Sequence, residues 1–111
     1  MEHRLKAKMI RKLDSMLNTL SNRAVFLFGH ANATLDMADY LLQACVTPSG
    51  ILDNNASKQG GSYQTIPILP PEFMLSYTSA NSIVLIASRF YPEMAKQLRS
   101  LRYDGDIIQV V

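Results

Sequence analysis

The sequence has a single cysteine and no long apolar run. One cysteine, Cys45, permits no internal disulfide and no metal cluster built from several cysteines. Its place in an apolar helical pattern predicts a small buried hydrophobic residue rather than a reactive thiol. Because no apolar stretch approaches the ~20 residues that a membrane span requires, we predict no transmembrane helix.

The first 23 residues also lack the uninterrupted apolar segment of a secretory signal, since charges run through them. The expected compartment is therefore the cytoplasm, including the inner face of the cell membrane. The net charge of +2 is small, and the basic residues that raise it lie mostly in one segment. Such a segment suits nucleic acid or an anionic membrane surface, but we expect no nucleic-acid partner.

Basic residues are concentrated at the start of the chain, where five of the eleven lie in the first twelve positions against one acid, Glu2. Apolar residues recur there at three- and four-residue steps, which predicts an amphipathic helix over residues 1–22. The stripe consists of Leu5, Met9, Leu13, Leu17 and Leu20. We expect the last three to pack on the domain and Leu5 and Met9 to reach a second copy, forming a homodimer. The basic residues are the solvated face of the helix or contact a peripheral membrane surface.

Apolar strands and helices alternate in the rest of the chain. Strands are expected at 24–28, 49–52, 66–69, 82–88 and 106–111, and helices at 32–45, briefly after 69, and from 92. This alternation predicts a three-layer α/β fold with a five-stranded parallel sheet in the order 3-2-1-4-5. Residues 1–111 form a single domain, with the sheet and its crossover helices in 24–111.

Ligands in this architecture lie beyond the carboxyl ends of the strands where the winding reverses. One loop predicted there is "GHANAT", which would need three glycines to match a dinucleotide fingerprint. Gly29 meets the first requirement, while Ala31 and Thr34 occupy the other two places. The free amides at the helix start near Asn32 still favour an anion, and His30 is a candidate hydrogen-bond donor whose alternative role is structural.

The second loop predicted there is "SRFYP". We expect Ser88 to cap the following helix and the Arg89 guanidinium to clamp phosphate in the crevice. Tyr91 either stacks on a base or packs in the core. Asp53, at the end of the second strand, is placed to bind a ribose hydroxyl or, alternatively, to start a turn through its side chain.

The sequence shows no nucleophile with its base, no carboxylate pair and no set of metal ligands. We therefore expect no catalysis by this chain alone and no metal site.

Four stretches, "VFLFGHANATLDMADYLL", "GILDNNASKQGG", "IPILPPEF" and "SIVLIASRFYPEMAKQLRSL", together resemble a known family. It is the small Rossmann-like domain of bacterial cell-surface polysaccharide enzymes, including teichoic-acid glycerophosphotransferases and related sugar-modifying transferases. The resemblance covers residues 24–111. Members usually carry a second glycine where this chain has Ala31, and the domain commonly accompanies a separate catalytic domain.

The resemblance implies a non-catalytic accessory domain that binds a nucleotide or nucleotide-sugar, with a CDP-linked or other nucleotide-activated substrate as the ligand. Its partner would be the catalytic transferase domain or protein. Two alternatives remain open. One is a docking module with an empty crevice, whose basic first helix docks on the catalytic partner or a membrane. The other is an NAD-binding sensor or dehydrogenase fragment, against which the missing glycines count.

Overall fold

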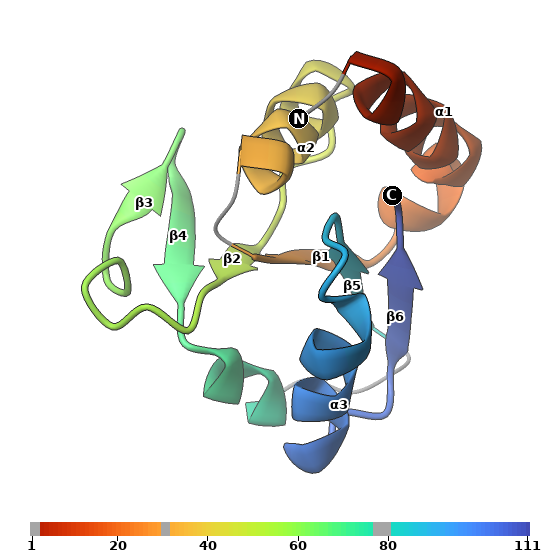
Figure 1. Cartoon of the computed structure of the whole chain (residues 1–111). Coiled ribbons are helices and arrows are strands. Elements are labelled where there is room, and N and C mark those ends of the chain that lie inside the picture. The colour runs from red at the N-terminus through yellow and green to blue at the C-terminus, as the bar shows by residue number, and fades with distance from the viewer. Residues whose placement is uncertain (1–2, 30–31, 77–80) are drawn as a thin grey trace.

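The computed structural model describes residues 3–29, 32–76 and 81–111 (Figure 1). Three α-helices, one 3-10 helix and six strands lie within these ranges. In chain order they are α1 (His3–Leu20), β1 (Ala24–Phe28), α2 (Asn32–Gln43), β2 (Gly50–Leu52), β3 (Ser62–Tyr63), β4 (Ile66–Leu69), η1 (Pro71–Ser76), β5 (Ser82–Ile86), α3 (Tyr91–Ser100) and β6 (Asp106–Gln109).

The strands form one sheet in the order β3-β4-β2-β1-β5-β6. All neighbours are parallel except β3 and β4, which are antiparallel. The predicted α/β class and the N-terminal helix are confirmed, whereas the predicted count of five strands is wrong because β3 adds a sixth at one edge. The five parallel strands keep the relative order expected for them, β4-β2-β1-β5-β6.

The extra strand belongs to a hairpin whose turn carries no glycine. Gln64 and Thr65 both have positive φ angles, of 49° and 71°, as a two-residue type I′ turn requires. Asn-Gly and Asp-Gly are the usual residues of such a turn, so Gln-Thr at these positions does not predict a hairpin. The Tyr63 hydroxyl donates a hydrogen bond of 2.8 Å to Asp39 on α2 and ties the hairpin to the domain.

Helices cover both faces of the sheet, α1 and α2 on one side and α3 and η1 on the other (Figure 1). Successive residues of β1 point to opposite layers: Val25 and Leu27 join the cluster under α1 and α2, and Phe26 and Phe28 join the cluster under η1 and α3. A strand buried on both faces has to be apolar throughout, which explains the uninterrupted run at 24–28.

Helix α1 packs on its own chain. Met9, Leu13 and Leu20 are at most 1% exposed, in the cluster that α1 shares with α2. The expectation that Met9 reaches a second copy is therefore wrong, because the four-residue step from Met9 to Leu13 keeps both on the inward face. Leu5 is 37% exposed.

The expected burial of Cys45 is also wrong, since its side chain is exposed. Helix α2 ends at Gln43, and Cys45 has a φ of 64° in the turn that follows. The Val46 N–H donates to the Leu41 carbonyl at 2.8 Å and the Cys45 N–H to the Leu42 carbonyl at 3.1 Å. This is a Schellman motif, in which the left-handed residue faces solvent and the next one, Val46, is buried.

Candidate functional site

A cavity of about 570 Å³ lies beyond the carboxyl ends of β1 and β5. These two strands are neighbours in the sheet, and the chain winds outward from them in both directions. The position is the one at which open α/β sheets bind their ligands. The two loops selected from the sequence both contribute to its lining.

Four of the predicted site residues line this cavity: Gly29, Thr34, Ser88 and Arg89. Asn32 begins α2 but is not among the lining residues, and His30 and Ala31 lie outside the described residues. Asp53 does not line the cavity.

Gly29 and Thr34 fit together at the turn between β1 and α2. The φ of Gly29 is +137°, and a Cβ added there would lie 2.7 Å from the Thr34 hydroxyl oxygen. Thr34 is only 1% exposed, so its hydroxyl fills the space that a Gly29 side chain would need. The Gly29 N–H donates to the Leu52 carbonyl at 3.1 Å and is therefore already engaged by β2. An anion at this turn would have to use the first turn of α2 rather than the glycine amide.

Asp53 holds the loop after β2. It is 2% exposed, and its Oδ1 accepts a hydrogen bond of 2.8 Å from the Asn55 N–H. Its carbonyl accepts a second hydrogen bond, also of 2.8 Å, from the Gln59 side chain. This geometry matches the turn-forming role that was the alternative to ribose binding.

The neighbouring residue Asn54 reaches the cavity instead. Its side-chain amide exchanges two hydrogen bonds with the amide of Gln97 on α3, at 3.0 and 2.7 Å. The pair ties the loop after β2 to α3 at the edge of the cavity. Sequence reasoning missed Asn54, although it stands one position after the residue selected.

In the second loop, Ser88 shapes the turn rather than capping α3. Its Oγ accepts a hydrogen bond of 3.0 Å from the Phe90 N–H, and Phe90 itself is the N-cap residue of α3. The expected capping role is therefore wrong, because α3 begins at Tyr91, two residues later than a Ser88 cap requires. The Tyr91 hydroxyl donates to the Ile107 carbonyl at 3.1 Å, which favours packing over base stacking for Tyr91.

Arg89 and Phe90 form a cation–π pair at the cavity. The Arg89 guanidinium carbon lies 5.2 Å from the centre of the Phe90 ring, and both side chains are exposed, the Phe90 ring at 56%. Such a pair offers a ligand both a forked cation for an anionic group and an aromatic face for a planar one.

The rest of the lining is apolar and comes from six parts of the chain. It comprises Leu5, Phe28, Ala33, Ala87, Met94 and Val111. Leu5 extends from α1 into this wall, so the N-terminal helix takes part in the site. Within the described residues the lining contains no carboxylate, histidine or cysteine side chain.

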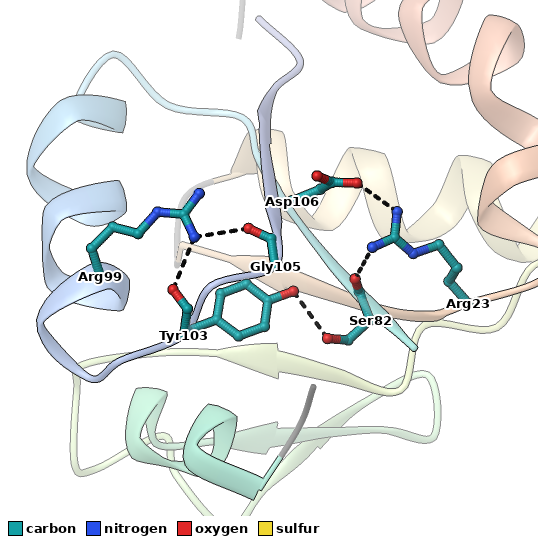
Figure 2. Close-up of polar contacts among 6 residues, drawn as sticks. All are labelled: Arg23, Ser82, Arg99, Tyr103, Gly105 and Asp106. Carbon is teal, nitrogen blue, oxygen red and sulfur yellow. Dashed lines mark hydrogen bonds and ion pairs between the residues drawn. The ribbon is translucent and has the colours of Figure 1, made fainter. Parts of the chain in front are cut away.

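The opposite end of the sheet carries a separate polar cluster (Figure 2). Arg23 pairs with Asp106 at 2.7 Å and donates to the Ser82 carbonyl, while Arg99 donates to the Tyr103 and Gly105 carbonyls at 2.9 Å. The Tyr103 hydroxyl hydrogen-bonds Ser82 Oγ at 3.0 Å, and burial raises the pKa of Tyr103. These groups bond mainly to one another, so we interpret the cluster as structural.

No group of three or more histidine, cysteine, aspartate or glutamate side chains is arranged to hold a metal ion in the part of the chain that the structure describes. Among the helices of those residues, none has the length and apolar character needed to cross a membrane.

Comparison with protein-family models, with curated proteins and with solved structures finds no match for this chain.

Proposed function

We propose that this chain is a non-catalytic binding domain that takes a nucleotide or nucleotide-sugar in the cavity at the ends of β1 and β5. The resemblance of residues 24–111 to the Rossmann-like domains of bacterial cell-surface polysaccharide enzymes supplies the wider context. In that context the domain is an accessory to a teichoic-acid type transferase, acts at the inner face of the membrane, and binds a CDP-linked or related nucleotide-activated substrate.

The cavity is the observation that carries the proposal. It combines a cation at Arg89, the amino-terminal turn of α2 behind Thr34, and an aromatic and apolar wall that includes Phe28 and Phe90. A nucleotide presents the matching parts, a phosphate for the cation and helix start and a planar base for the apolar wall. Asn54 adds an amide at the rim, where it can hydrogen-bond a sugar hydroxyl.

A binding role accounts for the chemistry of the lining better than a catalytic one does. General bases in enzymes are most often histidine or a carboxylate, and the described part of the lining offers neither. The catalytic step would belong to a partner transferase domain or protein.

The test is a titration of the isotopically labelled chain with CDP-glycerol, CMP and NAD, followed by backbone amide shifts. We expect shifts at Gly29, Thr34 and residues 88–90, and a preference for the cytidine ligands over NAD. Arg89→Gln should weaken binding by about 1.5–3 kcal/mol, the range for a hydrogen bond to a charged group. Arg102→Gln is the matched control, because Arg102 lies past the other end of α3 and does not line the cavity. Unshifted amides at low-millimolar ligand would refute nucleotide binding.

Asp53 and Asn54 provide a second, internal comparison. Asn54→Ala should lower nucleotide affinity, whereas Asp53→Ala should lower stability, because it removes the Oδ1 that accepts from the Asn55 N–H. The hydrogen bond from the Gln59 side chain goes to the Asp53 backbone carbonyl and remains in this variant. An Asp53→Ala chain with normal stability and weakened binding would instead support the original ribose-binding expectation.

One observation favours the docking module as a second candidate. Four large apolar side chains are exposed among the described residues, namely Leu5, Phe73, Leu75 and Phe90, and Leu5 and Phe90 both border the cavity. A catalytic partner or a second copy could cover this region. Sedimentation of the chain alone and with the partner tests this candidate, and Leu5→Ser should abolish any association that depends on the cavity rim.

A further inference from the structure

A second groove lies on the other side of Val111 from the cavity. Its volume is about 480 Å³, and it runs between α1 and the segment that ends β6 and follows it. Lys8, Arg11 and Lys12 form one wall, and residues 109–111 form the other. The end of β6 and the residues after it lie beside α1 (Figure 1).

The three basic residues point into one groove because of their spacing. Steps of three and four residues place side chains on the same face of a helix, so Lys8, Arg11 and Lys12 are neighbours on α1. All three are exposed. Like charges at this spacing repel one another and destabilise the helix. The second and third turns of α1 therefore carry a cost that an anion in the groove would remove.

No carboxylate side chain neutralises this charge among the described residues. The ion pairs found there are Lys6 with Asp36 and Arg23 with Asp106, and none of these four residues lines the groove. Even with a carboxylate on Val111, the groove would keep an excess of positive charge. The rest of the chain after residue 12 holds six basic and eight acidic residues, so the positive charge is local to this segment.

We propose that this groove is a binding site for a soluble diphosphate group, separate from the nucleotide cavity. A guanidinium can hold two phosphate oxygens at once, and the two ammonium groups act as additional point charges. Two adjacent phosphates present several negative charges on neighbouring oxygens, which matches three clustered cations better than a single carboxylate does. Gln109, exposed on the opposite wall, adds an amide donor.

The shape of the site favours a soluble group over a lipid headgroup. The groove is shallow, and a compact soluble group can contact both the cations and residues 109–111, whereas a headgroup in a flat bilayer would contact chiefly the exposed cations. Because the groove has its own charges and shares only Val111 with the cavity, the proposal does not depend on nucleotide binding in the cavity.

The experiment is an amide-shift titration of the full labelled chain with sodium pyrophosphate. We expect shifts at residues 8–12 and 109–111, with little change at Gly29 and Thr34. A chain carrying Lys8→Gln, Arg11→Gln and Lys12→Gln should bind at least about tenfold more weakly. A control chain carrying Lys58→Gln and Lys96→Gln should bind as the parent does, since neither residue lines the groove. Binding should also weaken as salt is raised.

Three results would overturn the proposal. The first is the absence of shifts at residues 8–12 at low-millimolar pyrophosphate, and the second is unchanged affinity in the triple variant when its melting curve matches the parent. The third comes from vesicles of phosphatidylglycerol and phosphatidylcholine: co-sedimentation that needs the three cations and that pyrophosphate cannot displace would identify the site as a membrane contact. A failed CDP-glycerol titration with successful pyrophosphate binding would reject the proposed function and leave this site standing.

Discussion

Replacing Gly29 by alanine tests whether the turn after β1 is built as the structure indicates. The new Cβ would lie 2.7 Å from the Thr34 hydroxyl oxygen, and alanine would have to adopt a φ of +137°. Crowding a buried side chain of this kind costs about 1–3 kcal/mol. A backbone conformation that L-residues rarely adopt costs about 1–3 kcal/mol more. Gly29→Ala should therefore lower the free energy of unfolding by about 2–6 kcal/mol.

The two contributions can be separated by changing Thr34. In Gly29→Ala/Thr34→Ala the hydroxyl is gone, so the crowding should disappear and only the backbone strain should remain. We expect the double variant to be about 1–3 kcal/mol more stable than the sum of the single effects predicts. Gly29→Ala/Thr34→Ser is the matched control, because serine keeps the hydroxyl that the Cβ meets and should not recover this energy.

Urea unfolding followed by circular dichroism measures these differences as shifts of the midpoint at constant slope. Gly61→Ala serves as a second control, since its Cβ would meet only the Lys58 carbonyl at 3.3 Å and its φ is not in the positive range. It should change stability by less than about 1 kcal/mol. Strictly additive effects at Gly29 and Thr34, or an undisturbed Gly29→Ala chain, would refute this account of the turn.

Further predictions concern other parts of the fold. Gly105→Ala should cost about 2–4 kcal/mol in urea unfolding, because its Cβ would lie 2.2 Å from the hydroxyl oxygen of the buried Tyr103; a neutral result would contradict this packing. Arg102→Gly should raise the melting temperature, with a gain of about 0.5–1 kcal/mol, because Arg102 has a φ of 65° in a turn that favours glycine. Leu13→Ala should cost about 2–5 kcal/mol, since Leu13 is fully buried between α1 and the domain; an unchanged midpoint would mean that α1 does not pack there. Burial raises the pKa of Tyr103, and the hydrogen bond to Asp39 raises that of Tyr63, both from 10.0. The folded state then favours the protonated phenols, so their contribution to stability is complete below about pH 10 and is lost as the pH rises through their folded-state pKa values. Tyr103→Phe should make the free energy of unfolding fall less steeply over this pH range, as measured by unfolding at a series of pH values.

The sequence was a good guide to the parallel part of the sheet. Strands β1 and β5 are buried on both faces, which favours apolar residues at nearly every position. Such apolar runs can be recognised in the sequence alone. Strand β3 could not be found in this way. It has two residues, lies at a sheet edge, and is followed by a turn in which Gln64 and Thr65 have positive φ angles. Glutamine and threonine do not predict such a turn.

The end of α2 illustrates a related limit. The apolar periodicity continues past Leu42 to Cys45, and periodicity alone therefore extended the helix. The chain instead stops at a Schellman motif whose left-handed position is held by cysteine rather than by the usual glycine. The outcome depended on the packing of Val46 against the core, a tertiary effect that local sequence does not encode.

Within the candidate site, the sequence identified loops more reliably than side chains. Both loops follow from the rule that ligands bind beyond the carboxyl ends of parallel strands. Neighbouring residues of a loop can point in different directions, so the local backbone conformation decides which of them faces the cavity. After β2 the backbone places Asp53 inside its own turn, where it is buried, and Asn54 in the lining of the cavity. Leu5 was missed because it lies more than twenty positions before Gly29, the nearest loop residue of the site in the sequence. It reaches the cavity only because α1 packs on the rest of the domain.

The turn after β1 differs in mechanism from the glycine-rich turn that the fingerprint describes. There, successive glycines leave backbone amides open to a pyrophosphate. Here the Gly29 amide is bonded to Leu52, and the Thr34 side chain occupies the space above the glycine. The turn therefore joins β1 to α2 and to β2, and any phosphate in the cavity must depend on the start of α2 and on Arg89. Since a single exposed arginine beside Phe90 holds one phosphate better than two, a ligand in the cavity should present one phosphate there, and CMP should bind about as well as its diphosphate counterpart. A much tighter diphosphate complex with shifts confined to the cavity would show that the turn supplies donors beyond those described.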